Sequence, residues 1–154
     1  MVNRLLCCEP LTGQRWVDVT AQRTRRDWAQ QLQPLADVRS PTAERLVLVL
    51  DTLNVHTPGA LYDAFPPAQA KQLAEKLELH YTPKHGSWLN IAEIELSVLS
   101  RQCLDRRVPD AATLADEVHA WQERRNAAVR RVDWRFTTED ARIKLKRLYP
   151  SFHE

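Results

Sequence analysis

Three polar side chains follow one aliphatic run within six residues. Asp51 comes directly after Leu46–Leu50, and Asn54 and His56 follow it. Ligands of open α/β sheets bind beyond the carboxyl ends of the strands, and carboxylate oxygens are preferred ligands of Mg²⁺. Asn54 could orient a phosphate or a water molecule, and His56 could donate to an oxyanion. Asp is also common where a strand enters a turn, so a purely local role for this loop stays open.

Glu93 is a second candidate carboxylate. Apolar residues spaced by three and four predict a helix with one buried stripe, and Glu93 borders that stripe. We therefore expect its carboxylate to point toward the rim of the sheet, although an ordinary solvated glutamate is the alternative. Glu95 lies about 200° further round the helix, so the two are not expected to reach one ion. The stripe consists of Leu89, Ala92, Leu96, Leu99 and Cys103.

The segment before this helix is dense in polar, aromatic and turn residues. Lys84 and His85 could contact phosphate, and Gly86 permits close approach of a backbone. Trp88 offers a stacking face for a base. Asn90 is a polar neighbour of Glu93 on the same side of the helix. Together these residues indicate a phosphate-binding or nucleic-acid-binding surface beside Glu93.

Zinc and disulfide chemistry have little support. His80 and His85 could be metal ligands, but no cysteine or further carboxylate has matching spacing. Cys7 and Cys8 are adjacent and Cys103 lies far away, so no Cys-x-x-Cys pair is present. We expect three buried free thiols in a reducing cytoplasm.

Four strands are predicted to position these groups. Two short runs on either side of a Pro–Gly turn indicate a β-hairpin, and alternation in the second run predicts one face open to water. Leu46–Leu50 contains five aliphatic residues without alternation, which predicts a strand covered on both faces. The predicted strands are residues 5–9, 15–20, 46–50 and 79–82.

Helices are predicted over most of the remaining chain, so the pattern indicates an α/β domain. Thr24 with Asp27, and Thr137 with Asp140, have the spacing of capping boxes. A helical stretch to about residue 77 is broken by the adjacent Pro66 and Pro67. The predicted helices begin after Thr24, cover 57–77 with this break, cover 89–103, follow Asp110 and cover 137–148.

Composition excludes several classes. The 154 residues are 44% hydrophobic and 27% charged, which is typical of one ordered domain. No run approaches the ~20 apolar residues of a membrane span, and no secretion signal is visible, so we expect a cytoplasmic protein without membrane contact. Residues 124–147 contain nine Lys/Arg against three Asp/Glu. This excess could bind an anionic polymer, although cations near a helix C-terminus also suit the helix dipole.

Four segments resemble motifs of the DDE transposases of the mariner superfamily, in its bacterial insertion-sequence branch. They are DTLNVH at 51–56, YTPKHGSWLNIAE at 81–93, RQCL at 101–104 and WRFTTEDAR at 134–142. The resemblance implies a ribonuclease-H-like mixed sheet flanked by helices. It also implies a site that binds two Mg²⁺ or Mn²⁺ ions and cuts and joins DNA at element ends, with DNA ends and target as partners.

By position in these motifs, Asp51 matches the second acidic residue of the family and Glu93 the third. Between them lie 41 residues, more than in eukaryotic relatives of this family. Both carboxylates are expected to be catalytic and to bind the metal. The residues expected to contact DNA or phosphate are Asn54, His56, Lys84, His85, Trp88 and Asn90.

The sequence departs from the family at its start. The first catalytic Asp of the family lies on a strand upstream of the part that matches residues 3–9. We therefore expect residues 1–154 to form one partial catalytic domain that lacks the first, central strand, its Asp and the helix-turn-helix DNA-binding region. Asp18 belongs by position to the third strand and is not a substitute. The hairpin should then pair directly with Leu46–Asp51, or leave an open edge.

Loss of a shared ligand should cripple a two-metal site, so we expect little activity from this chain alone. A homodimer, and an upstream fragment that supplies the missing strand, are the partners that the resemblance allows. The alternative is a non-catalytic DNA-binding or dimerisation remnant that keeps the basic 124–147 surface. A third class is an unrelated Mg²⁺-dependent phosphohydrolase built on Asp51. A phosphoaspartate phosphatase is excluded, because Leu53 stands where its second Asp would be.

Overall fold

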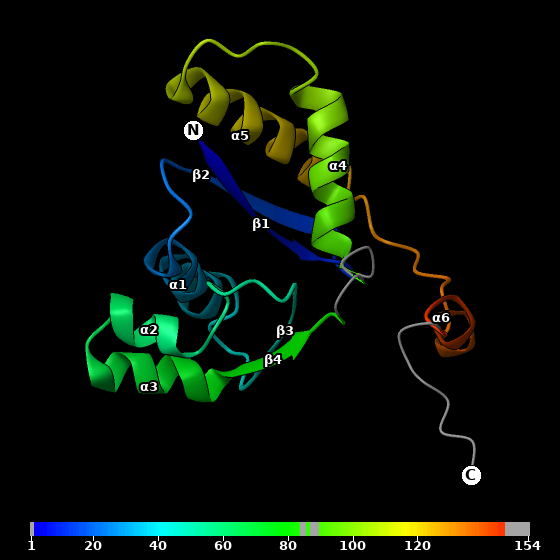
Figure 1. The fold of residues 1–154 in the computed structure, drawn as a ribbon. Helices are drawn as coiled ribbons and strands as arrows, with labels where there is room; N and C mark the ends of the chain where they lie inside the picture. The colour runs from blue at the N-terminus through cyan, green and yellow to red at the C-terminus, as the bar shows by residue number, and fades with distance from the viewer. Residues whose placement is uncertain (1, 84–85, 87–89, 147–154) are drawn as a thin grey trace.

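The strands form two separate two-stranded sheets in the part of the chain that the structure describes. The structure is a computed structural model that describes residues 2–83, 86 and 90–146. β1 (Asn3–Glu9) and β2 (Gln14–Thr20) pair antiparallel, and β3 (Leu46–Leu50) and β4 (Leu77–Tyr81) pair parallel (Figure 1). The four predicted strands are confirmed, with small differences at their ends.

The predicted helices are confirmed within the described residues, except that the last one ends at Lys144 and not at Leu148, and the predicted ends at Leu89 and Leu148 lie outside the described residues. Thr24 with Asp27 and Thr137 with Asp140 form complete capping boxes, and the predicted break lies at Pro66. A π-helical turn, which the apolar spacing does not reveal, follows Pro34. The helices are α1 (Arg25–Pro34), the π-helical turn η1 (Leu35–Arg39), α2 (Gly59–Ala64), α3 (Pro67–Lys76), α4 (Ile91–Cys103), α5 (Ala111–Ala127) and α6 (Thr138–Lys144).

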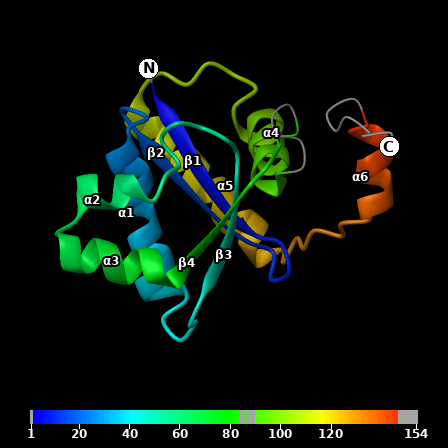
Figure 2. The same ribbon diagram turned by 60° about the horizontal axis from the view of Figure 1, so that its bottom comes forward.

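The hairpin β1–β2 lies between two helical layers, with α1 on one side and α4 and α5 on the other (Figures 1 and 2). Val17 and Val19 pack against the core of α4 and α5. Trp16 packs against the core that α1 contributes to, and the Arg39 guanidinium lies 4.5 Å from its ring centroid. The prediction of one face open to water is confirmed only in part, because Asp18 on that face is exposed whereas Trp16 packs against a core.

The prediction that Leu46–Leu50 is covered on both faces is also wrong. Its leucines pack on the larger core, together with Leu77 and Leu79 of β4. Val47 and Val49 point the other way and are 61% and 54% exposed. The reason is that the leucines of β3 pack on buried residues of α1, α2 and α3, while α4 packs against β1 and α5 against β2. The buried residues of this larger core are Trp28, Ala29, Leu32, Leu35, Ala36, Ala60, Leu61, Ala70 and Leu73.

The hairpin does not pair with β3, so the described strands do not form one mixed sheet. Of the two arrangements expected for a missing central strand, the structure has the one with open edges. β1 and β3 each have one hydrogen-bonded neighbour among the described residues. An aliphatic strand with an unpaired edge and an exposed face is a place where another strand can be added.

Candidate active site

Asp51 lies where β3 and β4 end together. Leu50 is in register with Tyr81, and the backbone N–H of Thr82 donates to the carbonyl oxygen of Leu50 at 2.8 Å. The Thr52 hydroxyl donates to the carbonyl oxygen of Thr82 at 2.8 Å. These bonds tie the loop after β3 to the end of β4. The predicted position of Asp51, at the carboxyl edge of a parallel strand pair, is confirmed.

His56 pairs with Asp51 across this loop. Its Nδ1 lies 2.6 Å from Asp51 Oδ1, and the two side chains are 12% and 35% exposed. The imidazole lies against the ring of Trp28, with 5.3 Å between ring centroids, and the Tyr81 hydroxyl donates to the His56 carbonyl oxygen at 2.7 Å. His56 is thus held in place and in turn fixes the Asp51 carboxylate. Enough of Asp51 stays exposed for the carboxylate to contact a ligand from solvent.

Glu93 is exposed in the first turn of α4. The Asn90 side chain caps this helix, because its Oδ1 accepts from the backbone N–H of Ala92 at 3.0 Å. The partial positive charge of a helix N-terminus favours a carboxylate at this position. Glu93 makes no ion pair or side-chain hydrogen bond within the described part of the chain, so it is available to an external ligand. Its carboxylate faces solvent and not the buried rim that the sequence predicts.

The other predicted contact residues divide into two groups. Asn54 is exposed in the turn after β3, close in sequence to the Asp51–His56 pair. Lys84, His85 and Trp88 lie outside the described residues. β4 leads through this segment into α4, so the chain connects the edge that carries Asp51 to the helix that carries Glu93 (Figure 1).

The donor chemistry around Asp51 suits a hard divalent cation, because the two predicted ligands are carboxylates. The number of ligands is small. No group of three or more metal-ligating side chains is found among residues 2–83, 86 and 90–146. Two carboxylates are too few for a two-metal centre, which needs further ligands.

A buried ion-pair network is the feature that sequence reasoning missed. Arg15 is fully buried, and its Nε donates to Glu95 Oε2 at 2.5 Å. Arg125 Nη2 donates to both oxygens of Glu95 at 3.1 Å. Arg15 also donates to the carbonyl oxygens of Gly13 and Arg130, both at 2.6 Å. The network joins the hairpin, α4 and the end of α5.

The signal for this network was present in the sequence. Glu95 lies four residues before Leu99, and therefore on the buried side of α4. Arg15 alternates with Val17 and Val19 on the same face of β2. Charged residues at apolar positions of two elements indicate a buried pair, but the sequence does not say which partners meet.

We expect Glu95 to make the stability of the fold depend on acid pH. Burial alone would raise the pKa of Glu95, but hydrogen bonds and charge from Arg15 and Arg125 hold it below its ordinary value of 4.5. A carboxylate with a lowered folded pKa stabilises the fold above pH 4.5, and this contribution is lost as the pH falls through the folded pKa. Urea unfolding between pH 6 and pH 3 should show this loss.

The matched variants for this titration are Glu95→Gln and Glu93→Gln, which remove one carboxylate each from the same helix. Glu95→Gln should be less stable at pH 6 and lose less stability on acidification. Glu93→Gln should keep the wild-type profile. Identical profiles for both variants would contradict the assignment.

The cysteines are free, as predicted, but their burial differs from the prediction. Cys103 is buried, whereas Cys7 and Cys8 are half-buried in β1. Burial raises the pKa of the Cys7 and Cys8 thiols to about 11. Both are therefore protonated near neutral pH and are poor nucleophiles.

No helix in the described part of the chain is long and apolar enough to cross a bilayer.

Comparison with known proteins identifies one family. The model of a family described as DDE superfamily endonuclease matches residues 1–115. The matched range contains the Asp51–His56 pair and Glu93, and also Arg15 and Glu95 of the buried network. No curated protein and no solved structure matches the chain.

Proposed function

Because the chain belongs to the DDE superfamily of endonucleases, we propose that it is part of the catalytic domain of a DNA transposase. The proposed branch is the bacterial insertion-sequence branch of the mariner superfamily, whose motifs the sequence resembles. The proposed substrates are the DNA ends of the element and its target. The observation that carries this proposal is the Asp51–His56 pair at the carboxyl edge of β3.

Asp51 and Glu93 are the proposed catalytic carboxylates, and Mg²⁺ or Mn²⁺ is the proposed cofactor. Asp51 and Glu93, with the further ligands that a two-metal centre needs, would hold the ions, which would supply stabilisation of negative charge on the phosphodiester oxygens. His56 would act as a positioning residue, because it holds Asp51 Oδ1 and leaves the exposed part of the carboxylate for the ion. Asn54 and Asn90 lie near these two carboxylates in sequence, as candidate polar contacts to DNA.

We also propose that a further strand completes this domain and carries the first carboxylate. The open edge of β3 supports this, because an unpaired strand edge carries backbone N–H and C=O groups that can pair with another strand. A ribonuclease-H-like sheet would have this strand at its centre. An upstream segment, in the same or another chain, is the proposed source, and a second copy of the protein is the proposed partner on paired DNA ends.

A protein that consists of residues 1–154 alone should therefore show little or no strand-transfer activity. We expect no cleavage of DNA by the isolated chain with Mg²⁺ or Mn²⁺ above the level of an Asp51→Ala variant, as followed on labelled duplexes. Metal-dependent cleavage that Asp51→Ala abolishes would confirm the nuclease site and contradict the proposed inactivity. Cleavage that survives Asp51→Ala would contradict the site itself.

A non-catalytic DNA-binding remnant is the second candidate function. It is favoured by the gathering of arginine side chains at the end of α5. The two candidates differ at Asp51, because only the catalytic one requires a divalent ion there. Both candidates predict DNA binding that weakens with salt.

A further inference from the structure

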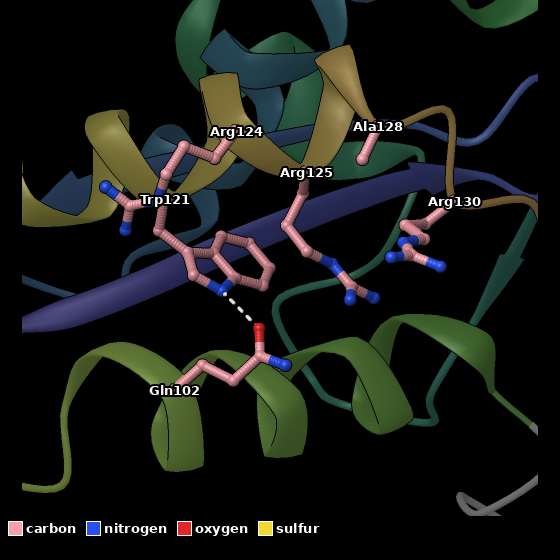
Figure 3. Close-up of a pocket in the computed structure, with 6 residues that line it drawn as sticks. All are labelled: Gln102, Trp121, Arg124, Arg125, Ala128 and Arg130. Atoms are coloured by element: carbon pink, nitrogen blue, oxygen red, sulfur yellow. Dashed lines mark hydrogen bonds between the residues drawn. The ribbon is translucent and has the colours of Figure 1, made fainter.

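An open pocket of about 320 Å³ lies between α4 and the end of α5, far in sequence from Asp51. Figure 3 shows the guanidinium groups of Arg125 and Arg130 pointing toward the same gap above α4, with Arg124 on the other side of Trp121. The pocket is lined by Gln102, Trp121, Arg124, Arg125, Ala128 and Arg130. Three of the six lining side chains are therefore cationic, and none is acidic.

The buried network beneath this pocket carries excess positive charge. Glu95 is the single carboxylate that Arg15 and Arg125 share. The Nε of Arg125 is buried and has no hydrogen-bond partner. One guanidinium charge is thus uncompensated within the network, and an unpaired buried donor is costly unless a ligand or water satisfies it.

Two further arginines add to this charge at the surface. Arg124 and Arg130 are exposed, and neither makes an ion pair with a carboxylate in the described part of the chain. Arg130 is presented by a turn in which Val129 has a φ of 46°. That conformation is unfavourable for a β-branched residue, so the surrounding contacts must hold the turn in place. One such contact is the Arg15 hydrogen bond to the Arg130 carbonyl oxygen.

The aromatic ring in this pocket is not free to stack on a base. Trp121 is 2% exposed, and its indole N–H donates to Gln102 Oε1 at 3.0 Å. The pocket therefore offers forked cationic donors without a stacking surface. Guanidinium groups match the geometry of phosphate oxygens and bind them in a bidentate manner.

We propose that these arginines bind neighbouring phosphate groups of the DNA backbone, Arg125 with Arg130 on one side of Trp121 and Arg124 on the other, at a site separate from the Asp51 edge. This inference rests on the proposed function for the identity of its ligand. The C-terminal end of α5 opposes an anion with about half an elementary charge. The positive charges of Arg15, Arg124, Arg125 and Arg130, opposed by the one carboxylate of Glu95, outweigh this repulsion from the end of the helix. Because phosphate contacts carry no sequence information, the pocket positions DNA without reading its bases.

The test is the salt dependence of DNA binding by the full chain, measured by fluorescence anisotropy with a labelled duplex. Each phosphate contact contributes about 0.9 to the slope of log affinity against log salt. The double variant Arg124→Gln with Arg130→Gln should reduce the magnitude of that slope by up to about 1.8. Arg124→Lys with Arg130→Lys should keep most of it, because the charge remains.

The matched control is Arg4→Gln with Arg23→Gln, which removes the same charge near the other end of the hairpin. Both control residues are exposed and make no ion pair within the described residues. A smaller slope in the pocket variant than in the control supports the proposal. Equal slopes would overturn it, since the effect would then be one of net charge. Thermal unfolding of each variant verifies that the fold is intact.

Two further arms separate the ligand and the proposed function. Titration with inorganic phosphate shows whether the pocket takes a free anion. Phosphate binding that the pocket variant loses, with unchanged DNA binding, would overturn the assignment to DNA. Asp51→Ala should leave the salt slope unchanged. If the pocket variant has the same salt slope as its control, this inference is rejected and the proposed function is not affected. The proposed site at Asp51 is tested separately, by metal binding.

Discussion

Glu95→Ala is expected to lower the free energy of unfolding by about 3–5 kcal/mol, the usual cost of removing one partner from a buried ion pair. Arg15 is fully buried and would lose its carboxylate partner. Arg125 would lose the same partner. Since whole domains are stable by about 5–15 kcal/mol, this one change could remove most of the stability.

Urea unfolding followed by circular dichroism measures this loss. The matched control is Glu93→Ala, two residues away on the same helix but exposed, with an expected change within about 0.5 kcal/mol. If Glu95→Ala fails to fold, the double variant Arg15→Met with Glu95→Leu serves as the second measurement. It should recover stability, because apolar residues replace the buried charges and Arg125 is partly exposed. Equal stability of Glu95→Ala and Glu93→Ala would contradict the importance of the network.

Asp51→Ala is expected to weaken Mn²⁺ binding by more than about 100-fold, since it removes a direct ligand. His56→Ala should weaken binding by about 10–100-fold, the typical effect of losing a residue that orients a metal ligand. The basis is the 2.6 Å contact between His56 Nδ1 and Asp51 Oδ1. Isothermal titration with Mn²⁺ alone measures both affinities.

Asp63→Ala is the matched control for this experiment. Asp63 is an exposed aspartate at the end of α2 that pairs with Arg25, outside the proposed site. It should bind Mn²⁺ like the wild type. His56→Gln, which keeps a hydrogen-bond donor near Asp51, should recover part of the affinity that His56→Ala loses. Equal Mn²⁺ affinity in Asp51→Ala and Asp63→Ala would show that the metal is not held at this edge.

Local features of the fold could be predicted from the sequence because neighbouring residues decide them. The capping boxes at Thr24 and Thr137 involve groups three residues apart, and both formed as expected. The hairpin likewise follows from a turn between two short apolar runs. Asp51 was placed correctly, because a residue directly after an aliphatic strand must lie at the edge of the sheet.

Contacts between distant segments could not be predicted in the same way. The sequence by itself determined the type and order of the elements and the position of Asp51. Only the tertiary structure decided that Val47 stays exposed and that Glu95 meets Arg15 from the hairpin. The periodicity of a sequence shows that one side of a helix or strand is apolar. Which other element covers that side depends on contacts between residues far apart in the sequence. The burial of a charge and the choice of its partner depend on the same long-range contacts.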